Sequence, residues 1–201
     1  MDGLHFDYIR YPHGDACYCD GCRERFQADT GVKVTEWPGE VRRPGSARDQ
    51  YLDWRCRQIT RLVAAVHDEA KKIKPNLKIS AAVFGAYPGC RESVGQDWVA
   101  WVEAGYVDFL CPMDYNTSDT AFVGLVENQL KLVGGRVPVY PGIGAWLLGS
   151  PDRVVGQIYH ARALGAPGFT VFNLDEGAAR EMLPGVGLGA GSQRATPPHA
   201  R

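Results

Sequence analysis

The sequence lacks any apolar run approaching the roughly 18 residues that a membrane-spanning helix needs. Its first residues, Met1-Asp2-Gly3, also lack the charged and then apolar pattern of a secretory signal. Lysine and arginine (22) nearly balance aspartate and glutamate (23), so no excess of one sign marks a polyanionic partner. We therefore expect a chain with no membrane span and no nucleic-acid partner.

Cysteine is scarce too, because six residues in 201 are too few and too unevenly spaced for a disulfide scaffold. Three of them, Cys17, Cys19 and Cys22, share one segment, which suits a structural zinc ion, a disulfide or free thiols. Zinc takes four ligands, and His13 or Asp15 would have to supply the fourth, or else Cys56. The isolated cysteines are more typical of ordinary packing positions: Cys56, Cys90 and Cys111.

Strand-like and helix-like segments alternate along most of the chain. Short runs of branched and aromatic residues predict strands at 3–9, 78–88, 107–115, 137–146 and 168–175. Apolar residues return at helical spacing in the segments 46–73, 98–104, 122–133 and 151–164. Residues 13–45 have the composition of a long irregular excursion with one helical turn near 23–29.

Such alternation, with short connections, predicts parallel strands joined by right-handed crossovers, hence an α/β fold. Five βα units are fewer than the eight of a TIM barrel, and no GxGxxG turn of a nucleotide-binding sheet follows a strand. We expect an incomplete (β/α)8 TIM barrel, strands four to eight, as a catalytic domain over 1–182. The alternative is an open five-stranded parallel sheet.

Two further expectations follow from this architecture. An incomplete barrel exposes open strand edges, so we expect either a missing N-terminal barrel segment or self-association. Residues 183–201 contain almost nothing to bury and are expected to form a disordered tail.

Polar and aromatic residues gather where the predicted strands end, which is the edge where parallel α/β proteins build their sites. Carboxylates there can act as acid, base or nucleophile, and aromatic rings can support the apolar face of a sugar. The combination favours a carbohydrate substrate. The residues concerned are His5, Asp7, Arg10, Asp114, Tyr115, Asn116, Trp146, Phe172, Asn173, Asp175 and Glu176.

The segment from Asp2 to Pro12, DGLHFDYIRYP, resembles the DGxHFDYxRYP signature of the bacterial glycosyl-hydrolase-like family ten. The later segments VDFLCPMDYN, PGIGAW and GFTVFN are similar to the sixth, seventh and eighth barrel strands of that family. The resemblance covers about residues 1–180. It implies a TIM barrel entered at its fourth strand, an activity on glycosidic bonds of a poly- or oligosaccharide, and no organic cofactor. Relatives are commonly secreted.

A more distant likeness is to the family-eighteen chitinases, whose fourth strand reads DGxDxDxE. This sequence keeps Asp2 and Asp7 of that pattern but has His5 for the middle aspartate and Ile9 where the acidic glutamate would stand. The substrate-assisted mechanism of those enzymes therefore does not transfer to this chain.

Alternation along a strand puts His5, Asp7 and Ile9 on one face, which we expect to be the lumen. Asp7 is the first candidate for a catalytic carboxylate, and Asp114 and Glu176 are candidates for the second that glycosidases normally need. Strict alternation turns Asp114 away from the lumen, and the second carboxylate could equally lie in a missing segment. Expected to bind substrate are His5, Arg10, Tyr115, Asn116, Trp146 and Phe172.

Two competing functions remain open on the sequence alone. The chain could be a barrel remnant that binds carbohydrate without cleaving it, which Ile9 at the acid position favours. It could also be a zinc-stabilised interaction domain built around the three clustered cysteines.

Overall fold

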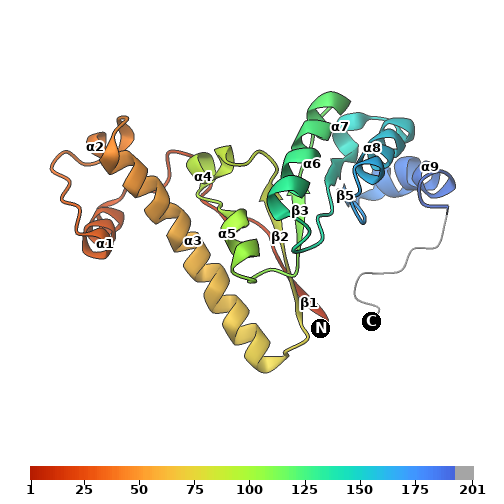
Figure 1. Ribbon diagram of the computed structural model, residues 1–201. Coiled ribbons are helices and arrows are strands. Elements are labelled where there is room, and N and C mark those ends of the chain that lie inside the picture. The colour runs from red at the N-terminus through yellow and green to blue at the C-terminus, as the bar shows by residue number, and fades with distance from the viewer. Residues whose placement is uncertain (193–201) are drawn as a thin grey trace. The chain divides into compact units, whose positions relative to one another are not determined.

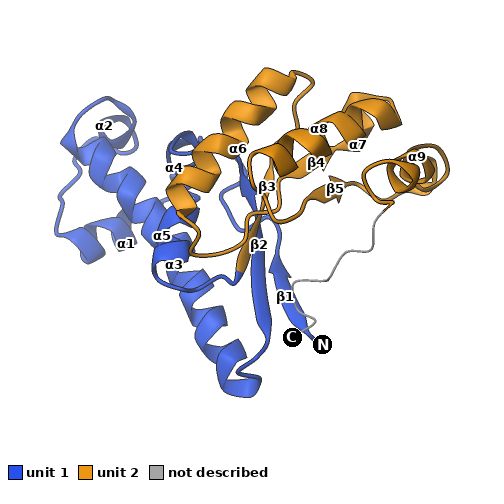
Figure 2. Cartoon of the chain, turned by 45° about the vertical axis from the view of Figure 1, so that its right-hand side comes forward, with its two compact units in different colours: residues 1–108 blue, residues 109–201 orange. Residues whose placement is uncertain are grey.

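A computed structural model describes residues 1–192 of the chain. The polypeptide divides into two compact units, with the boundary after Asp108 (Figure 2). We describe each unit by itself. The prediction of one catalytic domain over 1–182 stays a prediction.

Unit 1 is built around one parallel strand pair and one long helix (Figure 1). Its strands pair in register from Gly3 with Lys78 to Phe6 with Ala81. In chain order the elements are β1 (Gly3–Phe6), α1 (Asp20–Thr30), α2 (Gly39–Arg42), α3 (Ser46–Ile73), β2 (Lys78–Phe84), α4 (Gly89–Val94) and α5 (Trp98–Glu103).

Helix α3 confirms the strongest sequence prediction, because its bounds coincide with the amphipathic segment 46–73. Its apolar face buries Tyr51, Trp54 and Val63. Gly45 occupies the N-cap position of this helix. Strand β2 is buried over nearly its whole length, as expected for a strand of a parallel sheet covered on both faces.

The excursion 13–45 is more ordered than its composition predicts. Helix α1 runs for 11 residues and ends at Gly31, whose φ of 73° is the left-handed conformation that favours glycine at a helix end. The excursion packs on the first turns of α3 around a small aromatic-rich core of its own. That core consists of Cys22, Phe26, Val34, Val41, Tyr51 and Trp54.

Unit 2 contains three parallel strands, each followed by helical structure. Gly142 of the middle strand pairs with Met113 on one side and with Thr170 on the other. The elements are β3 (Phe109–Met113), α6 (Asp119–Val133), β4 (Gly142–Gly144), α7 (Ala145–Leu148), α8 (Pro151–Ala163), β5 (Thr170–Phe172), the π-helical turn η1 (Ala178–Met182) and α9 (Leu183–Leu188).

Two expectations for unit 2 are corrected by the structure. The strand predicted over 137–146 is shortened to β4, with one isolated bridge from Val139 to Leu110, and Trp146 lies in helix α7. Residues 183–192 are not disordered, because α9 covers Leu183–Leu188 and the buried core of the unit includes Val186 and Ala190. Residues 193–201 of the predicted tail lie outside the described residues.

The fold is mixed α/β, and the order of its five parallel strands follows the order of the chain. This arrangement is consistent with an incomplete TIM barrel or with an open parallel sheet, the two architectures that the sequence predicts. Within residues 1–192 no helix is long and apolar enough to cross a membrane.

Candidate functional site

Asp7 follows β1 directly, at the carboxyl end of the strand. Its side chain is 46% exposed, and its Oδ1 accepts a hydrogen bond from the backbone N–H of Tyr8 at 2.7 Å. Tyr8 has a φ of 54°, a left-handed conformation that is rare for a bulky side chain. The chain therefore turns sharply at Tyr8 and leaves the Asp7 carboxylate open to solvent.

That turn also corrects one prediction from alternation. His5 and Asp7 are exposed while Leu4 and Phe6 are half-buried, as alternation requires. Ile9 is buried, at 7% exposure, and does not share their face. The pattern breaks because the backbone leaves the extended conformation at Tyr8.

Arg10 lies behind the carboxylate, packed between two aromatic rings. Its guanidinium carbon is 4.4 Å from the ring centre of Tyr8 and 5.0 Å from that of Phe84, the last residue of β2. Its Nη1 is 4.0 Å from Asp7 Oδ1, and only 13% of its side chain is exposed. These ring contacts hold a fixed positive charge beside the exposed acid.

His5 is tied to the neighbouring strand, since its Nδ1 lies 2.8 Å from the Ser80 hydroxyl of β2. Burial lowers the pKa of His5, and the negative charge of Asp7 opposes this shift only in part. The unit 1 strand end thus combines a neutral-leaning imidazole, an exposed carboxylate and a packed guanidinium.

In unit 2 the corresponding strand ends bring aromatic residues together. The ring centre of Tyr115 lies 4.7 Å from that of Trp146, in an edge-to-face arrangement, and 5.2 Å from that of Phe172. A side chain at Gly144 would come within 3.2 Å of both Tyr115 and Trp146, so glycine leaves room for the pair. Trp146 remains 55% exposed. Three of the predicted substrate-binding residues therefore form one aromatic group.

Asp114 points the other way, as strict alternation predicts. The residue is fully buried, and its Oδ1 accepts a hydrogen bond from Gln129 Nε2 of α6 at 2.6 Å. Its second oxygen is also enclosed and makes no hydrogen bond within the described part of the chain. Burial raises the pKa of Asp114 to about 7, although the Gln129 bond opposes the shift.

The remaining polar candidates of unit 2 make local contacts. Asn116 accepts a hydrogen bond from the Ser118 backbone N–H at 2.9 Å, ahead of helix α6. Glu176 is exposed and forms an ion pair of 2.7 Å with Arg180, four residues further on. Asp175 Oδ1 accepts the Ala178 backbone N–H at 2.8 Å, at the start of η1.

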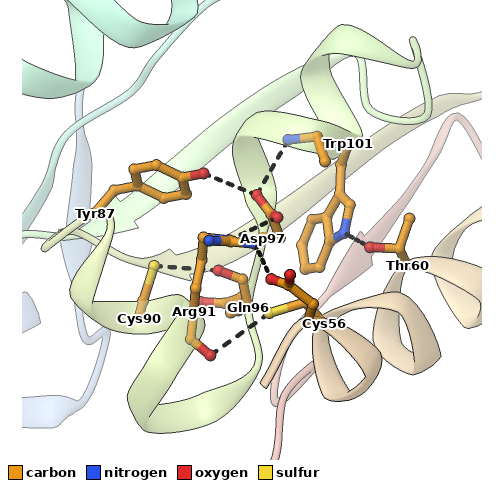
Figure 3. A network of polar contacts seen from close by, with 10 residues as sticks. Cys56, Thr60, Tyr87, Cys90, Arg91, Gln96, Asp97 and Trp101 are labelled. Carbon is orange, nitrogen blue, oxygen red and sulfur yellow. Dashed lines mark hydrogen bonds and ion pairs between the residues drawn. The ribbon is translucent and has the colours of Figure 1, made fainter. Parts of the chain in front are cut away.

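A second polar network in unit 1 joins helices α3, α4 and α5 through hydrogen bonds and ion pairs (Figure 3). Asp97, the N-cap of α5, accepts hydrogen bonds from the Tyr87 hydroxyl at 3.0 Å and from Arg91 Nε at 2.8 Å. Arg91 also bonds Asp53 of α3 at 2.8 Å. The ring of Tyr87 packs against that of Trp98, and its hydroxyl points at Asp97. Tyr87 is therefore part of this hydrogen-bond network.

One group of side chains in the described residues has the spacing of a metal site. The sulfur atoms of Cys17, Cys19 and Cys22 all lie within 4.8 Å of one another. Cys56, Cys90 and Cys111 lie apart from this group and are buried.

Sequence reasoning missed Tyr8 and Phe84 as partners of Arg10. The contact between Arg10 and Phe84 joins two strands far apart in the sequence, so no local pattern announces it. Position is the signal in the sequence that could have indicated Tyr8 and Phe84, because both residues lie at or just after the ends of two consecutive predicted strands.

Comparison with known proteins gives one family. The family model described as Glycosyl hydrolase-like 10 matches residues 1–158, which include the ends of β1 to β4 and the aromatic pair of Tyr115 and Trp146. No curated protein matches the chain significantly. The match covers well over half of the 201 residues, and the chain belongs to the glycosyl hydrolase-like 10 family.

Proposed function

We propose that the protein is a glycoside hydrolase acting on a poly- or oligosaccharide, with Asp7 as a catalytic carboxylate. The observation that carries the proposal is the accessibility of Asp7 at the carboxyl end of a parallel strand, with the Arg10 guanidinium 4.0 Å away. Glycosidases use carboxylates in this position as acid, base or nucleophile. Membership of a glycosyl hydrolase-like family supports the same reaction class.

Asp114 is assigned a different role in this proposal. A carboxyl group that is fully buried and bonded to Gln129 cannot touch a sugar without leaving its pocket. We infer that Asp114 fixes α6 beneath the strand end, and that the second catalytic carboxyl is another group.

Trp146 is the proposed sugar-stacking residue of unit 2. Its ring is more than half exposed and is braced edge to face by Tyr115. A half-exposed indole that packs against a second ring is the kind of surface on which the apolar face of a pyranose packs.

A non-catalytic carbohydrate-binding protein is the second candidate. It is favoured by Ile9, an apolar and buried residue at the position where the distantly similar chitinases have their acid. The aromatic group around Trp146 would serve this function equally well.

The two candidates are separated by assaying the protein on a panel of chromogenic glycosides and polysaccharides, with sugar binding measured by calorimetry. Asp7→Asn should lower turnover by about 10²- to 10⁴-fold and leave binding intact, because a positioned acid or base contributes that much. Asp114→Asn is the matched control and should retain turnover within a few-fold. Binding without turnover in the wild type would favour the non-catalytic candidate.

A further inference from the structure

We propose that Cys17, Cys19 and Cys22 form a zinc-binding site that fastens the excursion 13–45 to the start of α1. All three sulfurs lie within 4.8 Å of one another, and those of Cys17 and Cys19 are 3.3 Å apart. Two sulfurs on one tetrahedral zinc ion stand about 3.8 Å apart, since each Zn–S bond is about 2.3 Å. Small side-chain rotations would therefore bring all three onto one ion.

The backbone that carries the first two thiols is already fixed. Three successive carbonyl groups, those of residues 16–18, each accept a hydrogen bond from a side chain further along the chain. Arg55 donates to the carbonyl of Ala16, the Tyr51 hydroxyl to that of Cys17, and Trp37 Nε1 to that of Tyr18 at 2.9 Å. A loop held in this way pays little entropy when it binds an ion.

Two of the three thiols, those of Cys19 and Cys22, lie at the start of a helix. Cys19 is the N-cap of α1, and Cys22 lies in its first turn. Unpaired N–H groups at a helix N-terminus favour negative charge, and zinc binds cysteine as thiolate.

Arg25 supplies a counter-charge at the same place. Its Nη2 donates to Cys22 Sγ at 3.4 Å. Three thiolates and one Zn²⁺ carry a net charge of about −1, which one guanidinium balances. A donor to a ligating sulfur also orients that ligand for the metal.

The chain's other cysteines show what an ordinary packed thiol is like in this protein. Cys56 donates to the Arg91 carbonyl at 3.5 Å, and Cys90 to the Gln96 carbonyl at 3.2 Å. Among the described residues, neither belongs to a group of three side chains that could hold a metal ion.

The fourth position of the proposed site is assigned to water. Among residues 1–192 no other histidine, cysteine or carboxylate lies within 4.8 Å of all three sulfurs, so His13, Asp15 and Cys56 do not complete the group. Cys19 is exposed, which leaves the ion open to solvent on that side.

The test is the zinc content of untagged protein, purified under reducing conditions, measured by mass spectrometry of the metal. Wild type should hold about one zinc per chain, and Cys19→Ser should lose most of it without disturbing packing, because Cys19 is exposed. Cys56→Ser is the matched control and should keep its zinc, since serine can make the same bond to Arg91. A chelator should lower the melting temperature of wild type and leave that of Cys19→Ser unchanged.

Zinc-free wild type that also takes up no zinc on titration would overturn the proposal, as would a disulfide within the cluster in freshly isolated protein. If Cys19→Ser does not fold, Co²⁺ titration of wild type decides instead. A thiolate-to-cobalt charge-transfer band that zinc displaces supports the site, and its absence refutes it.

Discussion

The carboxylate that follows a strand is exposed to solvent in unit 1 and buried in unit 2. After β1, a left-handed turn at Tyr8 leaves Asp7 in solvent with an arginine behind it. After β3, Asp114 is enclosed against α6, and an aromatic group around Tyr115 occupies the exposed face instead. Similar positions in the fold thus give a charged end in one unit and an apolar, ring-lined end in the other.

The comparison shows that position at a strand end does not by itself decide whether an acid is accessible to solvent. Alternation along each strand turns Asp7 toward the exposed face and Asp114 toward α6, and the left-handed turn at Tyr8 then ends the extended backbone after Asp7. Four experiments would break or sharpen this contrast.

The largest effect is expected at Asp114. Burial raises its pKa to about 7 in the folded protein, so between about pH 4 and pH 7 the folded state holds a proton that the unfolded state has released. Stability should therefore fall as pH rises through this window. At pH 8, Asp114→Asn should be more stable than wild type by up to about 4 kcal/mol, and at pH 4 the two should be nearly equal.

Urea unfolding at pH 4, 6 and 8 measures this difference. Asp7→Asn serves as the surface control and should change stability by less than about 0.5 kcal/mol at each pH. A difference between wild type and Asp114→Asn that stays constant over the three pH values would contradict the raised pKa of the buried acid.

The second largest effect on stability is expected from adding a side chain at Gly142 in β4. A side chain at Gly142 would overlap the carbonyl oxygen of Pro112 in β3, so Gly142→Ala should cost about 1 to 3 kcal/mol. Gly124→Ala, in helix α6 with open space around it, should instead stabilise by about 0.5 to 1 kcal/mol. Thermal unfolding of both variants checks the pair, and equal effects would show that the strands do not approach closely at Gly142.

Trp146→Ala tests the aromatic end. Loss of the edge-to-face contact with Tyr115 and of the exposed ring should weaken oligosaccharide binding by about 1 kcal/mol, which is about fivefold in Kd. Tyr159→Ala removes another aromatic residue that is equally exposed, at 55%, and should leave Kd unchanged. Calorimetry with the best binder of the panel gives both values, and a matching loss in the control would argue against a specific platform.

The smallest effect is expected for Arg10→Met, which keeps the bulk of the side chain and removes its charge. Two cation–π contacts disappear, one of them with the exposed Tyr8 ring, so stability should fall by about 0.5 to 1 kcal/mol. Arg57→Met, on an exposed part of α3, should have no measurable effect. Denaturant midpoints distinguish them, and an unchanged midpoint for Arg10→Met would mean that the two rings do not hold the guanidinium.

Local pattern was enough to predict several elements of this fold and the direction of Asp114. The helices α3, α6 and α8 follow from apolar periodicity, which depends on neighbours three and four residues away. The alternation of β3 predicts that Asp114 turns from the face of Tyr115. Long-range contacts set the rest.

Three features escaped prediction for that reason. The core of the excursion forms only because Tyr51 and Trp54 of α3 pack against α1. Strand β4 is short because ladder pairing depends on its neighbours and not on its own apolar run. The left-handed turn at Tyr8 has no glycine or asparagine to signal it.

The three side chains that bond the carbonyls of residues 16–18 all come later in the sequence than those carbonyls. Trp37 lies 19 residues after its acceptor, Tyr51 lies 34 and Arg55 lies 39. During translation the cysteine segment therefore leaves the ribosome before any of its anchors. All three bonds can form only after the first turns of α3 have been synthesised, because Tyr51 and Arg55 lie there.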